Sequence, residues 1–172
     1  MSGGPLCKGL AVIILVMFLS ITDLVAMQDN PATEHEHHMA DLSKHGAEAM
    51  GFDQDKTVHH FRLRQDGGVV QVQAKDPTDV VSIAQIQHHL GLQKEKFSLG
   101  DFGAPEHTHG QVPPGVPTMK KLKSQIRYEF RKTSQGGTLS ISSSNPAAVE
   151  AIQQFLRFQI QEHKTGDPIN VQ

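Results

Sequence analysis

A pattern of strand, glycine turn, strand and helix occurs twice in this chain, and it constrains the fold more than any other feature. Gly67–Gly68 corresponds to Gly136–Gly137, and Asp76–Pro77 corresponds to Asn145–Pro146, both at an offset of 69 positions. Adjacent glycines tolerate the backbone of a tight hairpin turn, and Asp or Asn before Pro is typical of a helix start. We therefore expect one strand–strand–helix unit used twice; the alternative is two unrelated units that share only this general pattern.

The apolar side chains within each unit follow first the period of a strand and then that of a helix. Strand side chains alternate between two faces, whereas helix side chains three or four positions apart share one face. The expected strands are residues 57–65, 69–74, 126–132 and 138–142, with helices after Asp76–Pro77 and Asn145–Pro146. The expected product is an α+β two-layer domain, a four-stranded antiparallel sheet with two helices on one face.

The N-terminal part differs in composition from the rest. An apolar run of ten residues, Leu10–Leu19, resembles the core of a secretory signal peptide and is shorter than the roughly 20 residues of a membrane span. We divide the chain into a signal peptide (1–27), a His- and Met-rich mobile arm with a short helix (28–55) and an α+β domain (56–168), whose halves (57–101 and 124–168) are joined by a linker loop (102–123). We therefore expect a periplasmic or secreted protein that has no membrane span once the signal peptide is removed. The alternative is that this segment stays uncleaved and serves as a membrane anchor.

Charge and motifs exclude several functions. The 16 basic and 18 acidic residues are mixed along the chain, without the basic block that nucleic-acid binding requires. Phosphate-binding loops, HExxH and the nucleophile elbow are all absent from the sequence. Removal of the signal peptide removes Cys7, the one cysteine, so metal ligands in the mature chain are restricted to His, Met and carboxylates. The sequence therefore favours a binding protein over an enzyme.

The adjacent His59 and His60 lie within the first expected strand, so they must point to opposite faces. His59 shares its face with Phe61 and Leu63, which predicts an inward orientation. His60 shares its face with Arg62 and is expected on the open side of the sheet. The ordinary interpretation of His59 is a histidine at the edge of the core, hydrogen-bonded to a neighbour.

Two further histidines lie on the expected helices. His89 flanks Leu90 on the first helix, and His163 occupies in the second helix the position of Phe97 in the first. His163 is therefore expected to face the sheet. A buried neutral imidazole needs a partner for each ring nitrogen. A shared metal ion would satisfy several inward histidines at once.

Two local histidine patterns add candidates. In an extended loop, His107 and His109 point the same way and are predicted to bind Cu²⁺ or Zn²⁺ beside Glu106 or Asp101, unless they are only solvated loop residues. The tract "HEHHM" contains His35, His37, His38 and Met39, and it is predicted to capture ions loosely, with a solubilising tail as the alternative.

Four segments resemble a known group of sequences: "AMGFDQDKTVHHF", "GDFGAP", "PPGVPTMKKLK" and "FLRFQIQEHKTGDP". They resemble a family of uncharacterised, His-rich exported bacterial proteins over about residues 45–168. Some members carry an aspartate carbamoyltransferase label, but this chain is too short for that two-domain enzyme and lacks its Ser-Thr-Arg-Thr motif. The resemblance implies an exported protein of one coherent fold. Family members have a histidine where this chain has Gln153, which implies an altered site here if that position is a ligand.

The sequence thus predicts an exported protein that handles copper or zinc through histidines. The candidate metal ligands are His59, His60, His89, His107, His109, His163, His35, His37, His38 and Met39. One alternative is a metal-free periplasmic module that binds a protein partner or a ligand through the sheet face. A second alternative is a small metal-dependent enzyme.

Overall fold

The sheet has four antiparallel strands in the order β1-β2-β4-β3. A computed structural model describes residues 51–172 together with Met1. The strands are β1 (Thr57–Arg64), β2 (Gly67–Ala74), β3 (Arg127–Thr133) and β4 (Gly136–Ser142). The predicted α+β fold with a repeated strand–strand–helix unit is confirmed. The arm, its expected short helix and the expected signal peptide lie outside the described residues, apart from Met1 and the end of the arm.

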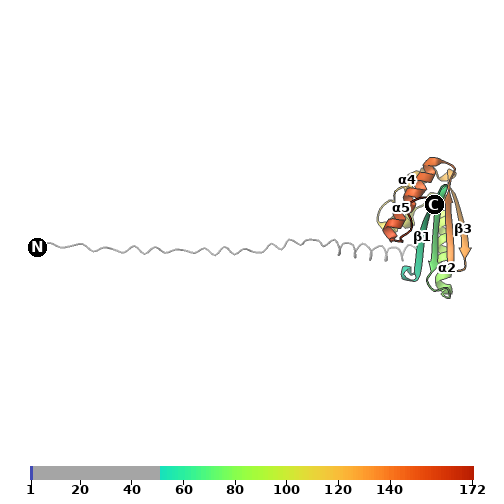
Figure 1. Ribbon diagram of the computed structural model, residues 1–172, viewed down its shortest axis with the longest axis horizontal. Coiled ribbons are helices and arrows are strands. Elements are labelled where there is room, and N and C mark those ends of the chain that lie inside the picture. Colours follow the sequence, from blue (N-terminus) through green and yellow to red (C-terminus); the bar gives the residue numbers. More distant parts are fainter. Residues whose placement is uncertain (2–50) are drawn as a thin grey trace.

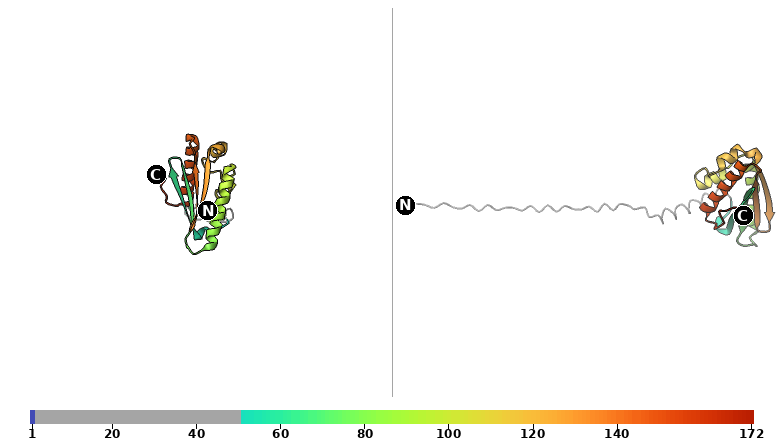
Figure 2. Two further views of the ribbon diagram at one scale, coloured as in Figure 1. Left: turned by 90° about the vertical axis from the view of Figure 1, so that its right-hand side faces the viewer. Right: turned by 45° about the horizontal axis from the view of Figure 1, so that its top comes forward.

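Two long helices, α2 (Val80–Ser98) and α5 (Pro146–His163), cover one face of this sheet (Figures 1 and 2). The Asp79 side chain caps α2 by accepting from the backbone N–H of Ser82, and the Asn145 side chain caps α5 by accepting from Ala147. Such caps satisfy backbone donors that a helix start leaves unbonded. Among the described residues, no helix combines the length and the apolar character needed to cross a membrane.

Each long helix lies mainly over the strands of the other unit. α2 packs chiefly on β4 and β3, and α5 packs chiefly on β1 and β2. Leu156 of α5 sits over Gly68, where an added Cβ would overlap its Cδ1 atom, and Leu90 of α2 sits over Gly137, where an added Cβ would lie 3.1 Å from its Cδ1 atom. The double glycines were predicted as turns, but they are the first residues of β2 and β4. A side chain at Gly68 or Gly137 would crowd the leucine that packs against it. The two units therefore interlock.

The predicted loop at 102–123 is wrong, since most of it is helical. It contains α3 (Gly103–His109) and α4 (Val116–Lys121), followed by the 3₁₀ turn η2 (Lys123–Gln125). Two of the four prolines that suggested a loop, Pro105 and Pro117, lie in the first turns of α3 and α4, where no backbone hydrogen bond is lost, and Pro113 and Pro114 lie between the two helices. The segment also carries apolar side chains with no solvent exposure, Phe102, Val116 and Met119, which belong to the core.

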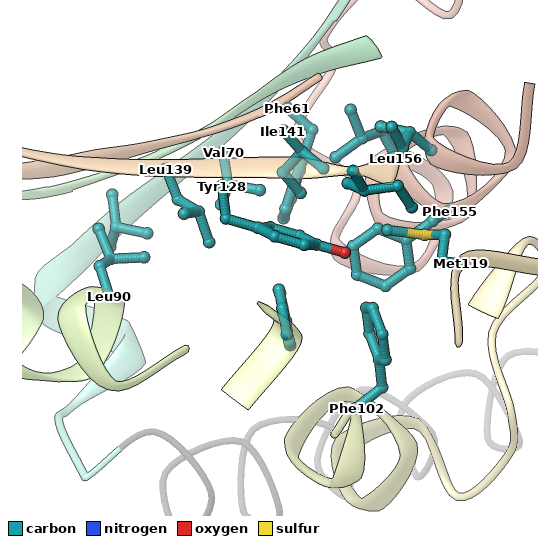
Figure 3. Close-up of a cluster of buried hydrophobic side chains, with 14 of the residues drawn as sticks. Phe61, Val70, Leu90, Phe102, Met119, Tyr128, Leu139, Ile141, Phe155 and Leu156 are labelled. Carbon is teal, nitrogen blue, oxygen red and sulfur yellow. The ribbon is translucent and has the colours of Figure 1, made fainter. Parts of the chain in front are cut away.

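A tyrosine is the unusual member of this core. Tyr128 of β3 is 6% exposed, and its hydroxyl makes no hydrogen bond within the described part of the chain. Figure 3 shows the hydroxyl pointing toward Phe155 and Met119. Burial raises the pKa of the phenol, because the phenolate would lose its hydration. The hydroxyl is therefore buried at a cost.

Replacing Tyr128 with Phe is expected to raise the free energy of unfolding by about 1–2 kcal/mol, because an unpartnered buried hydroxyl is removed while the ring is kept. Urea unfolding followed by circular dichroism measures the change. Tyr128→Leu is the control and should lower stability through lost packing. A loss of stability in Tyr128→Phe would mean that the hydroxyl has a partner.

The open edge of β1 is covered by the C-terminal strap, residues 165–172. Asp167 Oδ2 accepts from the backbone N–H of Phe61 at 2.9 Å, and Asp167 Oδ1 lies 3.0 Å from His60 Nδ1. Further along, the backbone N–H of Gln172 donates to the carbonyl of Leu63. The strap thus satisfies backbone groups that an edge strand leaves unpaired.

Candidate functional site

Four histidines from four elements line one pocket between the helices and the sheet. His59 comes from β1, His89 from α2, His109 from the end of α3 and His163 from the end of α5. The histidine pocket, as we name it, has a volume of about 80 Å³. Strand alternation turns His59 inward, and the apolar stripe of α5 does the same for His163, so both lie where their positions in the repeat predict.

His163 lies at the centre of the imidazole cluster. Its ring centre is 5.6 Å from that of His59, with the two planes 12° apart, and 5.1 Å from that of His109, with the planes 79° apart. The ring centre of Phe61 lies 5.7 Å from that of His163. On α2, His89 meets Phe52 edge to face at 5.5 Å. Aromatic contacts of this kind hold the rings in place.

Burial keeps two of these imidazoles uncharged at neutral pH. Burial, followed by the neighbouring His89 and His60, lowers the pKa of His59 to about 4. Burial, followed by the neighbouring His59 and His109, lowers the pKa of His163 to about 3. A protonated ring would lose water without gaining a counter-charge. Each of the two rings therefore has one unprotonated nitrogen at pH 7.

His109 is anchored by polar groups of α5. Its Nε2 lies 3.0 Å from Gln159 Oε1, and its Nδ1 lies 3.7 Å from Glu162 Oε2. Because an amide oxygen can only accept, His109 must carry a proton on Nε2 and donate it to Gln159. This bond also fixes the Gln159 amide with its Nε2 turned away from His109.

Three polar atoms around the histidine pocket are buried without a hydrogen-bond partner among the described residues. They are His59 Nε2, Gln93 Oε1 and Gln159 Nε2. Gln93 and Gln159 are 5% and 4% exposed, so solvent does not satisfy these atoms. Buried polar atoms are almost always bonded in folded proteins, and each exception needs an explanation.

The remaining walls of the histidine pocket are apolar. They include Phe61, Val70, Val72, Leu90, Phe97, Ala104, Pro105, Leu139 and Phe155. Within the described residues, the lining contains no Asp, Glu, Lys or Arg. The polar character of the pocket therefore comes from imidazole, amide and hydroxyl groups.

A second, polar cleft of about 420 Å³ shares His59 and His163 with the histidine pocket. Its other walls include the charged side chains Asp55, Lys75 and Glu162. The side chains of His59 and His163 therefore border both the histidine pocket and this charged cleft.

The geometry differs from that of a formed metal site. In residues 51–172, no group of three or more His, Cys, Asp or Glu side chains is arranged to hold a metal ion. The ring centres are close, but the rings of His59 and His163 lie nearly parallel, and His109 already donates to Gln159. Binding of an ion would require these rings to turn.

The predicted pairing of His107 and His109 is wrong. Both lie in α3, where residues two apart point in nearly opposite directions rather than the same one. His107 is exposed, while His109 is 8% exposed and lines the histidine pocket. The helix therefore separates two side chains that an extended loop would have brought together.

His60, another predicted ligand, lies apart from the histidine pocket. His60 points away from it and contacts Asp167 of the C-terminal strap. His35, His37, His38 and Met39 lie outside the described residues.

Sequence reasoning missed the two glutamines. Gln93 follows Leu90 by three positions and precedes Phe97 by four, so it lies on the inward face of α2. Gln159 follows Phe155 by four positions on α5. A polar residue on an apolar helical stripe was the available signal.

Comparisons of the chain with protein-family models, with curated proteins and with solved structures found no match.

Proposed function

We propose that the domain is a binding module whose histidine pocket takes a small, uncharged organic molecule. The observation that carries this proposal is the group of buried polar atoms without partners, His59 Nε2, Gln93 Oε1 and Gln159 Nε2, on otherwise apolar walls. Each such atom costs about 1–3 kcal/mol while it stays unbonded. A ligand that supplies the missing partners and fills apolar space would remove that cost. Small-molecule sites typically combine apolar walls with a few placed polar groups.

The lining favours an uncharged ligand over an ion. The described lining contains no Asp, Glu, Lys or Arg, and the imidazoles of His59 and His163 are neutral at pH 7 because burial lowers their pKa values. An anion or an ammonium group would lose its hydration here without gaining a counter-charge. A neutral molecule with hydrogen-bonding groups loses less and matches the polar atoms present.

A ligand screen by NMR tests this function. A set of uncharged compounds of up to about four heavy atoms is added to the full chain, and the ring C–H signals of His59 and His163 are followed. We expect saturable shifts from some of these compounds. Ala104→Leu should abolish them by filling the pocket with a larger side chain, since Ala104 lines it.

The matched control is Ala84→Leu, an equal enlargement at an exposed position of α2 outside the lining. It should leave the shifts unchanged. A screen without any hit, or hits that persist in Ala104→Leu, would reject the proposed function.

A copper or zinc ion is the second candidate, supported by the spacing of the rings. Two imidazoles on one tetrahedral zinc ion have centres roughly 5 Å apart, given Zn–N bonds of about 2.0 Å. The separations of 5.1 Å and 5.6 Å around His163 fall near that value. The signal-like run Leu10–Leu19 supports a periplasmic or secreted location for either ligand.

Calorimetric titration with Zn²⁺ and Cu²⁺ separates the two candidates. An ion in the pocket predicts one binding event that His163→Phe removes and that His107→Ala, at an exposed position, preserves. The tract His35–Met39 is present in both variants, so any ions it binds cancel in the comparison. Identical isotherms for the two variants would exclude the ion.

A further inference from the structure

We propose that the histidine pocket recognises a primary carboxamide group, read by the two buried glutamine side chains. This inference rests on the proposed function and names the chemical class of its ligand. Gln93 lines the pocket and has a buried carbonyl oxygen without a hydrogen-bond partner in the described residues, so it requires a donor. Gln159 also lines the pocket and has a buried amino group without such a partner, so it requires an acceptor. The ligand must therefore offer a donor and an acceptor together.

The orientation of Gln159 is set by its neighbour rather than by the ligand. His109 donates from Nε2 to Gln159 Oε1, which leaves the Gln159 amino group without a hydrogen-bond partner in the described residues. His109 is in turn held by the edge-to-face contact with Phe158 at 4.9 Å. The donor is thus fixed before a ligand enters, and preorganisation of this kind lowers the cost of binding.

Common uncharged and charged groups can be compared against this requirement. A ketone accepts but does not donate, so it would leave Gln93 Oε1 unbonded. A carboxylic acid offers both functions only when protonated, and at neutral pH it would enter as an anion where the described lining has no Lys or Arg. A primary amine donates but enters as a cation. A carboxamide stays neutral and supplies two N–H donors and one carbonyl acceptor in a plane.

The third unbonded atom, His59 Nε2, is compatible with the same group. An imidazole nitrogen donates or accepts according to its tautomer, and a carboxamide has a remaining donor and a remaining lone pair for either case. An alcohol has only one O–H donor and two lone pairs, so it would satisfy all three atoms only when His59 Nε2 carries the proton. The carboxamide matches the polar atoms in either tautomer.

The size of the pocket limits what can enter completely. A cavity of about 150 Å³ holds benzene, so the 80 Å³ here encloses about half as much. That space suits about four heavy atoms, the size of acetamide. The apolar walls, including Val72 and Phe97, would contact the methyl end.

Acetamide, acetone and acetate make a matched set of probes, because all three have four heavy atoms and differ in donor and charge. Each is titrated into the full chain at pH 7.5, and the ring signals of His59 and His163 are followed. Acetamide is expected to bind with a Kd on the order of millimolar, as its size allows. Acetone should bind at least about tenfold more weakly, since one buried atom stays unbonded. Acetate should cause no saturable shift.

Gln93→Leu removes the proposed acceptor. Acetone should still bind to this variant, and the ratio of the acetone Kd to the acetamide Kd should fall to about one. Gln93→Met serves the same purpose if the leucine variant fails to fold. The control is Gln85→Leu, at an exposed position of α2, which should keep the full preference.

Each outcome bears on one proposal. Equal binding of acetamide and acetone to the unchanged chain, or a preference that survives in both Gln93 variants, would overturn carboxamide recognition while leaving the pocket a site for small neutral molecules. Binding of none of the probes would also overturn it. Failure of the wider screen described above would remove the binding function itself.

Discussion

Lowering the pH from 7.5 to 4.5 is expected to remove about 5 kcal/mol from the free energy of unfolding, because His59 and His163 stay unprotonated in the fold. Burial lowers the pKa of His59 to about 4 and that of His163 to about 3, whereas both titrate near 6.5 in the unfolded chain. Urea unfolding by circular dichroism at several pH values measures the effect. A loss of this size is comparable with the whole stability of many small domains.

The sign follows from where the protons bind. Between pH 6.5 and about pH 4, the unfolded chain takes up two protons that the folded chain refuses, so stability is complete above pH 6.5 and declines below it. Three carboxyl groups have pKa values below their ordinary value of 3.8, so they take up protons in the fold only below that pH. They are Asp76, Asp79 and Asp167. The interval from pH 6.5 to 4.5 therefore lies above the range in which these carboxyl groups change charge.

Replacement of both histidines by Phe should flatten this pH dependence. Phe keeps the ring contacts with Phe52 and Phe61 and cannot take up a proton. The control is His107→Asn, because His107 is exposed and lies outside the histidine pocket. An unchanged slope in the double Phe variant would contradict the assignment of acid sensitivity to this pair.

The fold was predictable because its signals are local and periodic. Strand side chains alternate with a period of two, so the inward orientation predicted for Phe61 also predicts that His59 points inward and His60 outward. The repeat extends this prediction to α5, because His163 occupies the position of the inward Phe97. These expectations required no knowledge of how the layers pack.

The meeting of the histidines depends on the interlocked units, which local patterns do not describe. α5 lies over β1, a strand of the other unit, and this packing brings His163 to His59.

The prediction of a loop at 102–123 failed for a different reason. Pro105 and Pro117 suggested a loop, but a proline in the first helical turn loses no hydrogen bond, so composition alone could not distinguish the two structures.

Gly115 in this linker is expected to be among the least replaceable residues of the domain. Its φ of +84° is strained for any residue with a side chain, and a Cβ there would overlap the carbonyl oxygen of Ala151 in α5. It would also lie 3.2 Å from the backbone nitrogen of Phe155. Gly115→Ala should therefore push α4 away from α5 and cost more than about 3 kcal/mol of the free energy of unfolding. Urea unfolding at pH 7.5 measures this loss.

Gly110→Ala separates backbone strain from steric overlap. Gly110 has a similar positive φ of +62°, but a Cβ there would meet no atom within 4 Å. Its replacement should cost only the backbone term, about 1 kcal/mol. If the two alanine variants lost equal stability, close packing of the α4 start against α5 would not be what requires the glycine. A much larger loss at Gly115 would instead show that the linker supports the helix that carries Gln159 and His163.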